Sequence, residues 1–332
     1  MDTVSNAVAP GRRVFALQLC FVCGKNEPAN YLKTLMPDWE MVWSHGAGEL
    51  TDPNYFFIAK YNKYTDVEAL YALVIRGSVP PADDLADLVD YFLEDLNIVP
   101  VDWAHGPSGA KISAGAEIGF QPLKLEKNTL PGSKSQTALE YLKENAVGNR
   151  KRLLIAGHSL GGDLAKVYAS YYMQELKGGP IAAVDLVTFA APGSGNDIFQ
   201  NDLNSKVPSQ EHFQNSSDIV PYFPTANMSS VGALYNPSPS AAVVRTKDDK
   251  MTLKEFFEGL GTTLKPLGYQ QPFTGFLTIK GAAPIGKPDQ LTNTLPNWNL
   301  QAGTQHQIPV YSVLFDLPLP TGQQVMAEEA AV

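Results

Sequence analysis

The sequence has few cysteines and no long apolar run, and both absences exclude classes of protein. Only Cys20 and Cys23 occur among 332 residues, too few for a disulfide framework or a four-ligand zinc site. Their C-x-x-C spacing fits a redox pair, but we favour two thiols on one face of an apolar helix. The longest apolar stretch, Val14 to Cys23, has half the length that a membrane span requires and contains Gln18. We therefore expect a soluble protein without a stable membrane span.

Positive charge is also scarce. The 25 lysines and arginines face 34 aspartates and glutamates, so the net charge is −9. Such a chain repels nucleic-acid phosphates, and we expect no nucleic-acid partner. The sequence contains no H-E-x-x-H, EF-hand, P-loop or G-x-G-x-x-G pattern. It therefore predicts no metal and no other cofactor.

The order of residues near the N-terminus is faintly similar to a secretory signal peptide, because Arg12 and Arg13 precede the apolar stretch. No small-x-small cleavage site follows, and Cys23-Gly24-Lys25 is more typical of the end of a buried helix. We interpret residues 1–53 as an N-terminal helical region packed on the core. The compartment stays open between the cytoplasm and export by a route that is not obvious.

The middle of the chain alternates helical and extended patterns. A predicted hairpin comes first, at residues 54–62 and 67–76. Helical patterns then alternate with apolar strands: helices at 82–96, 135–147 and 160–176, strands at 152–156, 183–189 and near 212–214. This alternation predicts an α/β fold with a mostly parallel central sheet flanked by helices.

The segment 221–302 is rich in proline, glycine and serine, with short helical or extended pieces at 251–258 and 273–279. No charge run or repeat marks a linker. We therefore predict one α/β domain over residues 1–332, with an irregular, insertion-rich part at 221–302.

Residues 157–162, GHSLGG, carry the strongest chemical signal. This G-x-S-x-G motif directly follows an apolar strand and opens an amphipathic helix, the setting of a nucleophile elbow. Side chains at Gly157 or Gly161 would collide with the neighbouring strand and helix. Ser159 is the candidate nucleophile, and the amide of Leu160 is a candidate donor to an oxyanion. The alternative is a capping serine in an ordinary glycine-rich turn.

A serine hydroxyl needs a base to remove its proton, and an acid to orient that base. The chain has five histidines. His45 and His105 precede the serine, whereas this architecture places the partners after it. The side chain of His158 should point away from that of Ser159. Of the remaining two, His212 in a predicted strand and His306 in a polar loop, we favour His306.

Several aspartates compete for the role of the acid. Asp185 begins its strand and so lies at the end of the sheet opposite the serine, which excludes it. Asp197 and Asp218 both follow strands. We favour Asp218, directly after the last clear strand, while Asp197 could instead cap a turn.

A second oxyanion donor should follow an earlier strand. Arg76-Gly77-Ser78 ends the strongest strand of the N-terminal half, which makes Ser78 a candidate. An ordinary Gly-Ser turn fits these residues equally well.

Four blocks together resemble the class 3, or fungal-type, lipases. They are GHSLGG at 157–162, IRGS at 75–78, TFAAP at 188–192 with Gly195-Asn196, and NSSDIVP at 215–221 with Pro224. The resemblance covers residues 55 to 312. It implies an α/β-hydrolase fold, carboxylic ester hydrolysis, Ser159 as nucleophile, Asp218 as acid, His306 as base and Ser78 as oxyanion donor. The chain departs from compact members in the long span from Asp218 to His306, and it lacks the cysteines for the disulfides of secreted members.

Residues 79–99 resemble the lid of this family by their position after the oxyanion strand. Their helical pattern gives an apolar face made of Leu85, Leu88, Val89 and Phe92, and an otherwise acidic surface. The alternative is an ordinary surface helix. A lid of this composition predicts neutral glycerolipids as substrates rather than anionic phospholipids.

Together these features predict a serine hydrolase of lipid esters. The preferred interpretation is a triacylglycerol lipase with interfacial activation, acting through an acyl-enzyme on Ser159 with an Asp218–His306 relay. A phospholipase A1 or a soluble aryl-ester esterase of the feruloyl type is the alternative within the class. A catalytically silent lipid-binding protein is the alternative outside it. The sequence identifies no protein partner.

Overall fold

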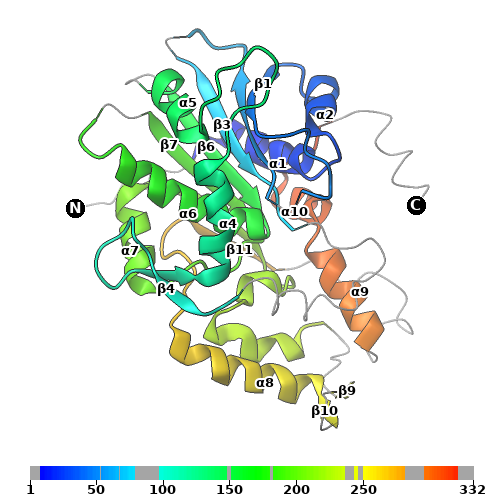
Figure 1. Ribbon diagram of the computed structural model, residues 1–332. Helices are drawn as coiled ribbons and strands as arrows, with labels where there is room; N and C mark the ends of the chain where they lie inside the picture. Colours follow the sequence, from blue (N-terminus) through cyan, green and yellow to red (C-terminus); the bar gives the residue numbers. More distant parts are fainter. Residues whose placement is uncertain are drawn as a thin grey trace.

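The computed structural model describes residues 8–52, 54–66, 68–78, 97–147, 151–179, 182–235, 243–245, 250–280 and 295–320. A seven-stranded sheet in the order β1-β2-β3-β6-β7-β8-β11 runs through the molecule (Figure 1). Its strands are β1 (Trp39–Ser44), β2 (Phe56–Tyr61), β3 (Leu70–Ile75), β6 (Arg152–His158), β7 (Ala183–Phe189), β8 (Ser209–Asn215) and β11 (Phe276–Ile279). β1, β2 and β3 pair antiparallel, and every pair from β3 to β11 is parallel. The predicted hairpin and the mostly parallel sheet are therefore confirmed.

Helices cover both faces of the sheet because its central strands are apolar on both faces. In β6, Leu153 and Ile155 belong to the core under α4 (Ala114–Leu125), α5 (Ala138–Asn145), α6 (Leu160–Glu175) and α7 (Asp197–Lys206). Leu154 and Ala156 point the other way, into the core under α1 (Pro10–Cys23), α2 (Pro28–Leu35) and α10 (Ile308–Phe315). Cys20 and Cys23 lie buried and unpaired on α1, in agreement with the helical interpretation.

A third apolar core lies beyond the carboxyl end of β6, where the sequence predicted irregular chain. Trp298, Phe257 and Val231 are fully buried in it, and Leu160 packs against it. This core joins two 3-10 helices to two α-helices: η2 (Val220–Tyr222) and η3 (Ala226–Ala233) to α8 (Leu253–Leu264) and α9 (Leu295–Gln305). Figure 1 shows α8 and α9 beyond one end of the sheet. The described parts of the segment are thus more regular than predicted.

The remaining elements are short. β4 (Pro100–Asp102) pairs with β5 (Lys111–Ser113), β9 (Val243–Arg245) pairs with β10 (Lys250–Thr252), and the 3-10 helix η5 (Lys265–Leu267) follows α8. The predicted helix at 82–96 lies outside the described residues. No helix in the described ranges has the length and apolar character needed to cross a bilayer.

Candidate active site

Ser159 occupies a sharp turn between β6, which ends at His158, and α6, which begins at Leu160. Its backbone is strained, with φ 58° and ψ −133°. The two flanking glycines allow the turn to close. A Cβ atom on Gly157 would lie 2.1 Å from the carbonyl oxygen of Gly161, and one on Gly161 would lie 2.2 Å from that of Ile75. The serine is thereby held at the carboxyl end of the central strand.

His306 lies between Ser159 and Asp218. Its Nε2 atom is 2.8 Å from Ser159 Oγ, and its Nδ1 atom is 2.8 Å from Asp218 Oδ2. A carboxylate can only accept, so Nδ1 carries the proton and Nε2 is left to accept one from the serine hydroxyl. The exposed fractions are 4% for Ser159 and 0% for Asp218, so both ends of this relay are buried, while the His306 side chain between them is 15% exposed.

Asp218 follows β8 and accepts hydrogen bonds from two donors besides His306. The amide of Val220 donates to Oδ1 at 3.0 Å. The hydroxyl of Tyr311 donates to Oδ2 at 2.8 Å and accepts from the amide of Asn215 at 3.1 Å. Tyr311 lies on α10, fully buried. This contact could not be predicted from the sequence, since no motif marks a tyrosine five residues after the histidine.

The segment that carries His306 is a helical corner and not the polar loop that the sequence predicted. α9 continues through Gln305, and α10 begins at Ile308. The side-chain amide of Asn215 donates to the main-chain oxygen of Gln305 at 2.9 Å and to its Oε1 atom at 2.8 Å. These contacts tie the end of β8 to the corner, and they bridge the long span between acid and base.

His158 also contributes to this corner. Its Nε2 atom lies 2.8 Å from the carbonyl oxygen of His306, so Nε2 carries the donated proton. Burial, and then the neighbouring His306, lower the pKa of His158 well below its ordinary value, which keeps its ring neutral. No sequence motif indicated a role for this side chain.

The other acid and base candidates lie elsewhere. His212, buried in β8, contacts Thr188 Oγ1 at 2.8 Å and Gln210 Oε1 at 2.9 Å. Asp197 is the first residue of α7. Asp185 lies near the start of β7, as the sequence predicted, and its Oδ2 atom is 2.5 Å from Arg12 Nε.

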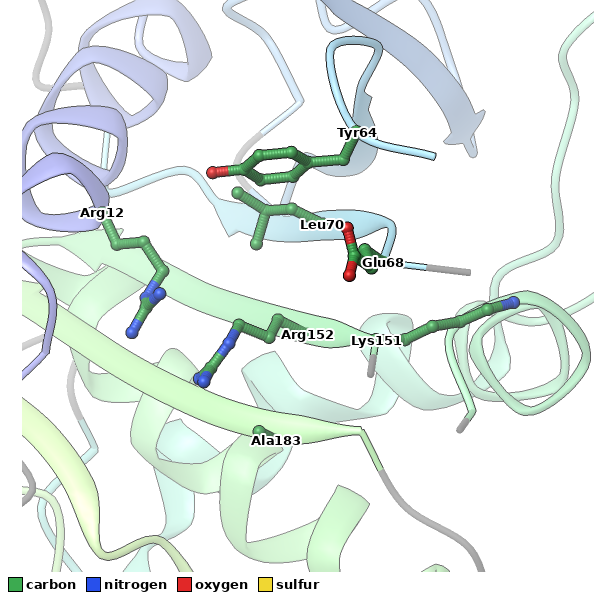
Figure 2. A pocket seen from close by; sticks show the side chains of 7 residues that line it. All are labelled: Arg12, Tyr64, Glu68, Leu70, Lys151, Arg152 and Ala183. Carbon is green, nitrogen blue, oxygen red and sulfur yellow. The ribbon is translucent and has the colours of Figure 1, made fainter. Parts of the chain in front are cut away.

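A pocket of about 400 Å³ opens at this amino end of the sheet. Figure 2 shows its lining, with Arg12 from α1 and Arg152 at the start of β6. Arg152 lies 3.9 Å from the buried carboxylate of Asp185, so both arginines offset that charge. The first residues of β3, β6 and β7 border this pocket. It therefore lies at the end of the sheet opposite Ser159.

The two candidate oxyanion donors flank the elbow. Leu160 opens α6, so its amide has no carbonyl partner within the helix. Ser78 lies just beyond β3, next to Gly77, where an added Cβ atom would be 2.7 Å from the carbonyl oxygen of His158 and 3.1 Å from Ser159 Cβ. The chain entering Ser78 thus runs in contact with the nucleophile turn.

Residues 79–96 of the predicted lid lie outside the described residues, and with them Leu85, Leu88, Val89 and Phe92. Within the described part of the chain, no three histidine, cysteine or carboxylate side chains gather into a group that could hold a metal ion.

Comparison with known proteins gives matches to lipases. A curated relative, the secreted mono- and diacylglycerol lipase 1 of Fusarium solani, is 34% identical over 73 residues, 22% of this chain and 20% of that protein. The match thus spans about a fifth of that relative's length. Among solved structures, M37 lipase superposes with a TM-score of 0.67 at 18% identity, covering 93% of each chain. This second likeness shows the fold, an α/β-hydrolase.

A family model described as lipase (class 3) matches residues 72–228, which run from β3 to η3 and include the serine elbow and Asp218. Over residues 72–228 the chain is therefore similar to the class 3 lipases.

Proposed function

We propose that this protein is a serine carboxylic-ester hydrolase, and specifically a triacylglycerol lipase. The observation that carries the proposal is the chain of contacts from Ser159 Oγ through His306 to Asp218, with 2.8 Å at each step. The match of residues 72–228 to the class 3 lipases supports the same chemistry.

In the proposed mechanism, His306 Nε2 takes the hydroxyl proton as Ser159 Oγ attacks the ester carbonyl. Asp218 stabilises the imidazolium that forms. The amides of Leu160 and Ser78 donate to the oxyanion, and the dipole of α6 adds positive potential at the same place. His306 then gives its proton to the departing alcohol. Water, activated by the same histidine, cleaves the acyl-enzyme and releases the fatty acid.

The experiment measures tributyrin hydrolysis as the concentration crosses the solubility limit, with Ser159→Ala as the control. We expect a steep rise in rate when the emulsion forms, and a loss of at least a thousandfold in the variant. Saturation below the limit would indicate a soluble esterase and contradict an interfacial lipase. Equal and negligible rates for the two proteins would contradict hydrolysis at Ser159 and favour a lipid-binding protein.

A further inference from the structure

Arg76, the residue after β3, is a buried cation with an unusual set of partners. Its exposed fraction is 2%. All five of its N–H groups find acceptors, and all five acceptors are main-chain carbonyl oxygens: Cys23 (2.7 Å), Lys25 (2.9 Å), Gly48 (2.7 Å), Glu49 (2.7 Å) and Asp52 (3.4 Å). The guanidinium also lies 4.6 Å from the ring centre of Tyr55.

Only arginine can make this set of contacts. A buried cation is costly unless every donor is satisfied, and the planar fork of arginine offers five donors in fixed directions. Lysine offers three. The side chain therefore ties together the end of α1 and the loop that precedes β2. The acceptors in these two segments lie 24 to 53 residues before Arg76 in the sequence.

The main chain of Arg76 touches the nucleophile turn on its other side. A Cβ atom on Gly161 would lie 2.7 Å from the carbonyl carbon of Arg76, and Gly77 contacts the turn as described above. The amide of Arg76 donates to the carbonyl oxygen of Tyr55 at 3.0 Å. A shift of Arg76 would therefore move Ser78 relative to Ser159.

We propose that Arg76 is a positioning residue, and that residues 23–52 support the oxyanion site through it. These residues precede the region matched by the family model, which begins at residue 72, so this support is a role for the N-terminal region beyond packing. The inference rests on the proposed function, because it concerns the geometry of Ser78 and Ser159 in ester hydrolysis.

The test compares Arg76→Lys with Arg152→Lys, a matched change at the opposite end of the sheet. Both are assayed on a soluble p-nitrophenyl butyrate solution, at a temperature where circular dichroism shows each variant to be folded. For Arg76→Lys we expect kcat to fall at least tenfold with KM within twofold, and the affinity for a trifluoromethyl ketone, which mimics the oxyanion, to fall with kcat. Arg152→Lys should keep kcat within twofold.

A purely structural arginine would lower the unfolding midpoint and leave kcat of the folded enzyme unchanged, which would overturn the inference. Wild-type protein provides a measurement that does not depend on variant folding. Phosphonylation of Ser159 fills the oxyanion site, and by reciprocal coupling it should slow amide hydrogen exchange in residues 48–52. Slower exchange confined to the elbow would also overturn the inference.

Labelling separates this inference from the proposed function. Wild-type protein that resists a fluorophosphonate at Ser159 would contradict the proposed function and this inference together. A labelled wild type with an equally active Arg76→Lys variant would contradict this inference alone.

Discussion

Three tyrosine hydroxyls meet the short loop that carries Asp218, and they differ in what they contact. Tyr222 donates to the carbonyl oxygen of Ser216 at 2.9 Å, and Tyr235 to that of Ser217 at 3.0 Å. Tyr311 donates to the carboxylate oxygen that also faces His306 Nδ1. Of these three, only Tyr311 acts on the orientation of the acid itself.

Removal of this one hydroxyl tests its role. We expect Tyr311→Phe to lower kcat about tenfold, the cost of losing one hydrogen bond to a charged group. Tyr222→Phe loses a hydrogen bond to a main-chain carbonyl in the same loop, and should keep kcat within twofold. Steady-state kinetics on a soluble ester measures both. Equal kcat values for the two variants would contradict a positioning role for Tyr311.

At the scale of elements, a glycine of strand β6, Gly157, and a glycine of helix α8, Gly259, should respond in opposite ways to substitution by alanine. Gly157→Ala places a methyl group 2.1 Å from the Gly161 carbonyl oxygen, and we expect it to lower the free energy of unfolding by more than about 3 kcal/mol. Gly259 is exposed within α8 and has open space at its Cβ position. Gly259→Ala should raise the free energy by about 1 kcal/mol. Urea unfolding measures both, and a stable Gly157→Ala variant would contradict the crowding argument.

Elements with strong local signals could be predicted from the sequence, and those that depend on distant partners could not. β7 lies at the predicted residues, and the β6–α6 turn follows from its glycines and apolar periodicity. α9 presents buried polar residues, Asn299, Gln301 and Gln305, whose burial depends on tertiary contacts. Its local pattern therefore resembles a loop. β11 has only four residues, all exposed, and takes its place by pairing with β8.

The same limit applies to the candidate site. The residue types of the candidates Ser159, Asp218 and His306 could be predicted from the chemistry of an activated serine, and their chain order from the α/β-hydrolase architecture. Tyr311 and His158 act through contacts with the acid and with the main chain of the base. No motif or fixed spacing in the sequence indicates either contact, so neither could be predicted.

For the molecule as a whole, buried histidines set the response to acid. Burial lowers the pKa of His212 well below its ordinary value, and the charge of Lys166 lowers it further. Burial also lowers the pKa of His158 well below its ordinary value. The unfolded chain binds these protons near pH 6.5 and the folded chain does not, so stability is full above that pH and is lost below it. Asp163 opposes them, because burial raises its pKa to about 6 and the folded chain gains stability as it protonates.

As the pH falls, the two histidines lower the free energy of unfolding by more than Asp163 raises it. The free energy of unfolding should therefore fall by about 1 kcal/mol between pH 6.5 and 5.5. Urea unfolding at the two pH values measures this change. His212→Gln removes one of the titrating groups and should flatten the slope, whereas His105→Gln, at a partly exposed ring, should change it less. A wild-type stability that rises over this interval would contradict the assignment.

The distance along the chain between Ser159 and His306, 147 residues, has a consequence for biosynthesis. During translation Ser159 leaves the ribosome long before His306 is synthesised. The helical corner that positions His306 also requires α10, which follows it in the chain. A nascent chain with a completed elbow therefore still lacks its proton acceptor. The proposed esterase stays inert during translation, and lipids around the ribosome are not exposed to a half-made hydrolase.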